Sequence, residues 1–187
     1  HQRYKQNCFL VWSITTCNEK IRRIIEPGTP PAYHMFSVIK KFTDAGINCG
    51  VNIDPIIPLI TDSEEEVDAI LDNCSRSGVG YVFGALLRLR EDIWERMQII
   101  LKLLDVNEGI EFYKRRIYQF TEPLKPRYNI AANESYSNKV LQILENKVLD
   151  RKMLFDFPHF IGDRRIKDHY TNNKKEKEQQ ITLMTYM

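Results

Sequence analysis

The chain has 187 residues, of which 43% are hydrophobic and 28% are charged, a globular composition that excludes a wholly disordered chain. Its 27 basic and 25 acidic residues give a net charge of +2, which lacks the strong single sign usual for proteins that bind nucleic acids or membranes. No apolar run approaches the roughly 20 residues of a membrane-spanning helix, so we expect no membrane anchor. Residue 1 is His and no charged-then-apolar leader follows it, so we expect no signal peptide and regard a fragment of a longer protein as one possibility.

Four cysteines, Cys8, Cys17, Cys49 and Cys74, are scattered along the chain, and no two of them form a Cys-X-X-Cys pair. A zinc or iron–sulfur site needs several thiolates close together, usually from such pairs, so the spacing predicts no metal site. A disulfide framework is also not expected in a chain of this size and spacing. We therefore predict buried free thiols and a location in a reducing cytoplasm.

The first predicted strand is the short apolar run 8–15, which is rich in aromatic and β-branched residues. Asn18 can cap a short helix that reaches Ile25, and the prolines and glycine of 26–31 predict a loop. A helix follows this loop, and Gly46 occupies a position where a glycine commonly ends a helix. The predicted buried face of that helix consists of Met35, Val38, Ile39 and Phe42.

The second predicted strand, 47–54, alternates apolar and polar side chains, so that Asn48, Gly50, Asn52 and Asp54 share one polar face. A loop follows, and Asp62 or Ser63 caps a helix whose first turn contains three glutamates, where the helix dipole favours anions. Gly78 ends this helix, and the third predicted strand spans 79–87. The predicted buried face of the helix consists of Val67, Ile70, Leu71 and Cys74.

Strands that alternate with helices over short turns predict a parallel β-α-β-α-β unit and an α/β fold. The strands of a doubly wound sheet are buried on both faces and are apolar throughout, whereas the second strand here has one polar face. This pattern favours a β/α barrel, in which one face of each strand points into the lumen. Three strands cannot close a barrel, so the alternatives are an open α/β domain and the later half of a barrel.

Beyond the third strand, apolar stripes predict further helices, and the polar stretch 168–180 predicts a flexible end. We therefore predict a β/α half-barrel at 1–90, a helical C-terminal region packed on it at 91–152, and an extended or flexible tail at 153–187. The residues expected to point inward from the helical region are Ile93, Met97, Ile100, Leu101, Leu104, Ile110, Phe112, Tyr113, Ile117, Val140, Leu141, Leu144 and Val148.

Three segments occur in a specific order: SITT at 13–16, EPGTPP at 26–31 and KKFTDAGINCGVNIDPIIPLITD at 40–62. In this order they resemble the radical S-adenosylmethionine (SAM) proteins related to spore photoproduct lyase, also described as DNA repair photolyase-like. The resemblance covers about 7–120 and implies a partial (β/α)6 barrel in which the three strands found here are the fourth, fifth and sixth. The superfamily's three-cysteine motif is not in this chain, so the resemblance implies that the ligands of a [4Fe–4S] cluster lie outside it.

The resemblance further implies an enzyme that cleaves SAM and uses the 5′-deoxyadenosyl radical to abstract hydrogen from a substrate. The partner that completes the barrel would be the N-terminal half of the same barrel or another copy of the chain, and DNA is a possible partner by analogy alone. Two other interpretations stay open. One is a non-catalytic α/β binding or interaction module, and the other is a cluster-free barrel enzyme, which normally has a Lys or His at a strand end that is not found here.

Functional side chains in β/α barrels lie at the carboxyl ends of the strands. Ser13 and Thr15 end the first strand, and the resemblance implies that a hydroxyl at this position binds SAM. Asn52, Asp54 and Pro55 end the second strand and are further candidates for cofactor binding. The alternative is structural, because these groups can also form hydrogen bonds that fix the following turn.

Two charged residues complete the candidate site, for which we assign no catalytic residue. Arg88 ends the third strand and is the candidate for binding a substrate phosphate or carboxylate, with a surface ion pair as the alternative. Glu26 follows the first helix, and we expect it to form an ion pair with Arg22 or Arg23.

Overall fold

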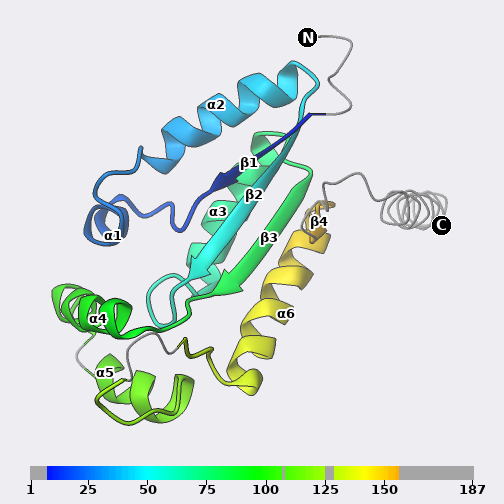
Figure 1. Ribbon diagram of the computed structural model, residues 1–187. Helices are drawn as coiled ribbons and strands as arrows, with labels where there is room; N and C mark the ends of the chain where they lie inside the picture. The colour runs from blue at the N-terminus through cyan, green and yellow to red at the C-terminus, as the bar shows by residue number, and fades with distance from the viewer. Residues whose placement is uncertain (1–7, 107, 125–128, 156–187) are drawn as a thin grey trace. The chain divides into compact units, whose positions relative to one another are not determined.

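The computed structural model describes residues 8–106, 108–124 and 129–155, all within one compact unit that spans 1–156. Its strands β1 (Phe9–Ser13), β2 (Asn48–Ile56), β3 (Tyr81–Leu86) and β4 (Leu154–Phe155) form one sheet in that order, and every neighbouring pair is parallel (Figure 1). The α/β prediction is confirmed. The prediction of three strands is wrong by one, because β4 is a fourth. Of the segment 153–187, predicted as an extended or flexible tail, Met153 is buried and Leu154–Phe155 form β4, whereas 156–187 lie outside the described residues.

The helices are α1 (Glu19–Ile25), α2 (Ala32–Asp44), α3 (Glu64–Arg76), α4 (Glu91–Leu103), α5 (Gly109–Phe112) and α6 (Glu134–Asp150), and a π-helical turn, η2 (Tyr113–Ile117), follows α5. The predicted caps are confirmed, because Asn18 accepts main-chain hydrogen bonds at the start of α1 and Ser63 does so at the start of α3. Gly46 and Gly78 follow α2 and α3 with φ of 77° and 73°, in the left-handed region that favours glycine.

One face of the sheet packs against α2, α3 and α6, and together they form the first core. The predicted buried face of α3 is confirmed, whereas that of α2 is shifted, since Phe36 is 4% exposed and Val38 is only half-buried. The fully buried side chains of this core include Ile39, Val51, Ile53, Ile56, Ile70, Leu71, Cys74, Val82, Leu144 and Val148.

A second core lies beyond the carboxyl ends of β2 and β3, where Figure 1 shows α4 and α5 past the arrowheads of these strands. The helical region predicted at 91–152 therefore contributes to two cores, since α4, α5 and η2 build the second and α6 belongs to the first. The buried residues of the second core are Ile25, Ile57, Ile60, Leu89, Trp94, Met97, Ile100, Leu101, Tyr113, Ile117, Tyr118, Leu124 and Ala132.

The opposite face of the sheet, which we call the open face, carries no packed helix from the described residues. The alternation along the strands and the register between them place Phe9, Val11, Ser13, Asn48, Gly50, Asn52, Asp54, Tyr81 and Phe83 on it. Val11 is 41% exposed, and Ser13 and Asn48 are exposed as well. The order of the four described strands does not reverse, so this part of the sheet has no switch point of the kind at which doubly wound folds bind their ligands.

Candidate functional site

Ser13 and Asn52 lie side by side at the carboxyl ends of β1 and β2, because the register pairs them directly. Ser13 is exposed and Asn52 is half-buried on the open face. The Oδ1 atom of Asn52 is buried and has no hydrogen-bond partner among the described residues. Leaving such an acceptor unsatisfied costs roughly 1–3 kcal/mol, so this amide is suited to a ligand that supplies a donor.

Asp54 and Pro55 follow Asn52 and are joined by a cis peptide bond. Asp54 is exposed, and no described residue forms a hydrogen bond or ion pair with its carboxylate. The alternative in which Asp54 fixes the turn beyond Pro55 is therefore not observed. The Asp54 carboxylate is therefore accessible to a ligand near the carboxyl end of β2.

Other residues hold the turn after β2. The Ile57 amide donates to Thr61 Oγ1 at 2.8 Å, and the Tyr113 hydroxyl donates to the Pro58 carbonyl at 2.6 Å. Burial raises the pKa of Tyr113 well above its usual value, so the phenol keeps the proton that it donates. The sequence contains no local signal for this contact, because the two partners are separated by 55 positions.

Thr15 is not an open ligand-binding group. It is 2% exposed, and its hydroxyl donates to Glu26 Oε1 at 2.7 Å. The neighbouring Thr16 is equally buried and donates to Glu66 Oε2 at 2.6 Å, and the Asn18 side chain donates to the other oxygen of Glu66 at 3.3 Å. The two threonines after β1 are thus each held by a carboxylate from another element.

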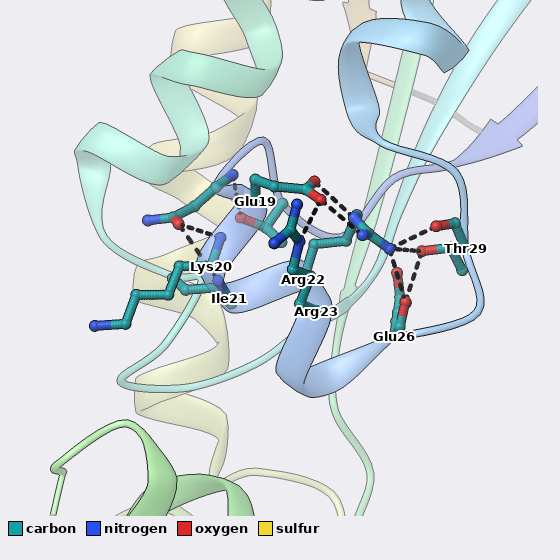
Figure 2. Close-up of polar contacts among 9 residues, drawn as sticks. Glu19, Lys20, Ile21, Arg22, Arg23, Glu26 and Thr29 are labelled. Atoms are coloured by element: carbon teal, nitrogen blue, oxygen red, sulfur yellow. Dashed lines mark hydrogen bonds and ion pairs between the residues drawn. The ribbon is translucent and has the colours of Figure 1, made fainter.

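The predicted ion pair of Glu26 with Arg22 or Arg23 is wrong. Both arginines bind Glu19, with Nε–O distances of 2.8 and 2.9 Å, and these hydrogen bonds lower the pKa of Glu19 to about 2 (Figure 2). The reason is helix geometry, because the i, i+3 and i, i+4 positions of α1 bring Glu19 next to both guanidinium groups, whereas Glu26 follows the helix end. Arg22 also donates to the main-chain oxygens of Glu26 and Thr29.

Arg88 lies beyond β3 and is not brought together with Ser13 and Asn52 by any observed contact. Its side chain is exposed and forms no ion pair with the described residues, so the surface pair considered as an alternative is not observed. The chain next to it is held by the Tyr118 hydroxyl, which donates to the Leu87 carbonyl at 2.7 Å.

The cysteines do not fit an iron–sulfur cluster. Burial raises the pKa of Cys17 and of Cys49 to about 11, Cys74 is also buried with a raised pKa, and Cys8 is exposed, contrary to the prediction of buried thiols throughout. A cluster requires grouped thiolates, and residues 8–106, 108–124 and 129–155 contain no group of three His, Cys, Asp or Glu side chains able to hold a metal ion. Within the same residues, none of the helices has the length and apolar character needed to cross a membrane.

Comparisons with known proteins give relatives without an assigned activity. The uncharacterized protein ORF301 of Acidianus two-tailed virus is 33% identical over 107 residues, which are 51% of this chain and 36% of that protein. The uncharacterized proteins Rv2578c of Mycobacterium tuberculosis and Mb2609c of Mycobacterium bovis are each 32% identical over 78 residues, 41% of this chain and 23% of the relative. The chain therefore spans about a third and about a quarter of the length of these curated relatives. No protein-family profile matches the chain, and no solved structure matches it.

Proposed function

We propose that this chain is the later half of the barrel of a radical SAM enzyme related to spore photoproduct lyase, and that its open face lines the cofactor cavity. The observation that carries the proposal is the buried Asn52 Oδ1 atom, which has no hydrogen-bond partner in the described part of the chain and lies beside the exposed Ser13 at the carboxyl ends of two parallel strands. Three helices packed on one face and polar groups on the other are the arrangement of a barrel wall, which supports the same proposal.

In this proposal, Ser13 and Asn52 bind the nucleoside part of SAM, since a hydroxyl and an amide can both donate and accept hydrogen bonds. Asp54 and the main chain around Pro55 form the adjoining rim, and Arg88 is the candidate contact for an anionic part of the substrate. Thr15 does not contact the cofactor in this proposal, because its hydroxyl is buried and donates to the Glu26 carboxylate.

The cluster of the proposed enzyme would be bound by another part of a longer polypeptide, since the described cysteines do not fit it. In enzymes of this class, reductive cleavage of SAM yields the 5′-deoxyadenosyl radical that abstracts hydrogen from the substrate. The relatives are three to four times longer than their matched segments, which leaves ample chain for an N-terminal half-barrel over the open face. A second copy of the chain is the other candidate for that position, and the proposed location is the cytoplasm.

Anaerobic purification of the complete protein tests this proposal. We expect a brown protein with iron–sulfur absorption that cleaves SAM to methionine and 5′-deoxyadenosine when it is reduced. Ser13→Ala and Asn52→Ala should each weaken SAM binding about tenfold, the equivalent of about 1.4 kcal/mol. Asn73→Ala is the matched control, because the Asn73 amide is already bound to the Ala69 carbonyl at 2.7 Å. A colourless protein after reconstitution, or SAM affinity unchanged in both site variants, would contradict the proposal.

A non-catalytic interaction module is the second candidate function, and one observation favours it. Ile99 and Leu103 lie one turn apart on α4 and are 60% and 63% exposed. Adjacent exposed apolar side chains of this kind occur at protein-binding surfaces. Sedimentation equilibrium of Val11→Lys and Leu103→Lys variants separates association through α4 from association through the open face.

A further inference from the structure

The candidate residues Asp54 and Pro55 lie in a β-bulge of β2. The pairing of β2 with β3 is regular up to Ile53 and resumes at Ile56, and over this stretch β2 contains one residue more than β3. A bulge of this kind bends the strand and changes the direction of its side chains, and bulges are frequent next to active sites. The Asp54 carboxylate is exposed in the bulge, so its direction decides what it can bind.

The two strands meet again immediately after the bulge, because the Leu87 amide donates to the Ile56 carbonyl at 2.9 Å. From this hydrogen bond, one segment runs into the turn that contains Pro58, and the other runs to Arg88, whose side chain is exposed. The conformation of the bulge and the position of Arg88 therefore depend on what holds these two segments.

A pair of buried tyrosines holds both segments. The Tyr113 hydroxyl of η2 donates to the Pro58 carbonyl at 2.6 Å. The Tyr118 hydroxyl, just beyond η2, donates to the Leu87 carbonyl at 2.7 Å. The two rings lie against each other with their centroids 5.4 Å apart, and the Tyr113 ring also stacks on Trp94 of α4. Packed rings of this kind have little freedom to move, so their hydroxyls define fixed points for the two carbonyls.

We infer that Tyr113 and Tyr118 are positioning residues of the candidate site. They fix the two segments that close the bulge, and in this way they set the direction of the Asp54 carboxylate and the position of Arg88. Neither tyrosine contacts the ligand. A displacement of about 1 Å at a binding group can lower activity about a hundredfold, so the two hydrogen bonds matter beyond their effect on stability. The inference deepens the proposed function and rests on it only for the identity of the ligand.

Nuclear magnetic resonance of the labelled complete protein tests the positioning role without any ligand. Tyr113→Phe and Tyr118→Phe each remove one hydroxyl and keep the ring in the core, so we expect both variants to fold. The ¹³C carboxyl signal of Asp54 should shift in Tyr113→Phe, and the ¹⁵Nε signal of Arg88 should shift in Tyr118→Phe. A shift in only one of the variants would overturn the role of the other tyrosine. Unshifted signals in both variants would overturn the inference whatever the outcome for SAM.

Thr43→Val is the matched control, because it removes a hydrogen bond of the same kind at the other end of the sheet. The Thr43 hydroxyl on α2 donates to the Ser77 carbonyl at 2.6 Å, just before β3 begins, whereas the bulge pairs with the end of β3. Its loss should lower stability as the loss of a tyrosine hydroxyl does, while the signals of Asp54 and Arg88 stay in place. Equal shifts of these signals in Thr43→Val would show that they report a general loss of stability, and would overturn the inference.

Calorimetry with SAM separates this inference from the proposed function. If the wild type binds SAM, Tyr113→Phe should weaken the binding about tenfold, whereas Thr43→Val should leave it unchanged. Wild-type affinity for SAM in Tyr113→Phe would overturn the positioning role and leave the proposed function intact. No binding of SAM to the wild type contradicts the proposed function instead, and the ligand-free signals of Asp54 and Arg88 then decide the inference by themselves.

Discussion

Among single residues, Asn52 has the clearest conflict between stability and function. Its buried Oδ1 atom has no hydrogen-bond partner among the described residues, so Asn52→Leu should raise the free energy of unfolding of the ligand-free protein by about 1 kcal/mol while weakening nucleoside binding at least about tenfold. Urea unfolding and calorimetry measure the two effects. Asn73→Leu, which removes a satisfied amide on α3, should be destabilising instead. A large loss of stability in Asn52→Leu would show that this amide serves the fold.

Gly84 sets how closely α6 approaches β3. A Cβ atom at this position would lie 2.5 Å from Leu144 Cδ2 and 3.2 Å from Ile56 Cδ1, both of which belong to fully buried side chains. Gly84→Ala should therefore lower the free energy of unfolding by about 1–3 kcal/mol in a urea titration. Gly80→Ala is the control, since a Cβ there has no neighbour within 4 Å, and its effect should stay within about 0.5 kcal/mol. Equal stability of Gly84→Ala and the wild type would contradict the close packing of α6.

The polar alternation of the second strand was sufficient to predict the sheet face that carries Asn52, and the end of the first apolar run was sufficient to predict the location of Ser13. The contacts of Thr15 with Glu26 and of Thr16 with Glu66 could not be predicted, because they join residues 11 and 50 positions apart. No local pattern encodes such pairings. They exist because the fold brings the end of α1 and the start of α3 to the end of β1.

Among the elements, α3 and α6 are joined by a ladder of ion pairs with Asp68 at its centre. Asp68 binds Lys147 and Arg151, each at 2.8 Å. Burial alone would raise the pKa of Asp68, but the hydrogen bonds from Lys147 and Arg151 outweigh it and hold the pKa below its usual value. The ladder therefore stabilises the fold above the pKa of about 3.9 of an unfolded aspartate, and this contribution is lost as the pH falls through the lower folded-state value.

Asp68→Asn should lower the free energy of unfolding by about 0.5–1 kcal/mol at pH 7, and the difference from the wild type should shrink as the pH falls below about 4. Chemical unfolding between pH 3 and pH 7 measures this trend. Asp44→Asn is the matched control, since it breaks a single exposed pair with Lys40 and should have a smaller effect at pH 7. A difference between Asp68→Asn and the wild type that is the same at both ends of this range would contradict the role of the ladder.

Elements with strong periodicity and capping residues were predicted well, and α3 is the best case because its buried face is the one expected. Phe36 of α2 was missed because the helix lies rotated, with Phe36 and Ile39 rather than Val38 turned to the sheet. The two-residue strand β4 was missed for a different reason. A segment this short has no periodicity, and it pairs with β3 only because α6 delivers it to the edge of the sheet.

At the scale of the whole molecule, the exposed open face leads us to predict that copies of the chain associate with one another. A chain studied without a segment that covers this face should self-associate through it, because β1 lies at the edge of the sheet and Val11 is 41% exposed at its centre. Val11→Lys should yield a monomer in sedimentation equilibrium. Leu103→Lys on α4 is the matched control and should leave the association unchanged. The opposite pattern would favour the interaction module, in which α4 presents the binding surface.

The proposed function depends on whether the open face binds the nucleoside of SAM. Titration of the ¹⁵N-labelled complete protein with SAM tests this directly through the side-chain amide signals of its asparagines. We predict that the Asn52 side-chain signal shifts with increasing SAM, while that of Asn73, bound to the Ala69 carbonyl on the other side of the sheet, stays in place. Saturable binding of SAM without any change at Asn52, or no binding of SAM at all, would contradict the account.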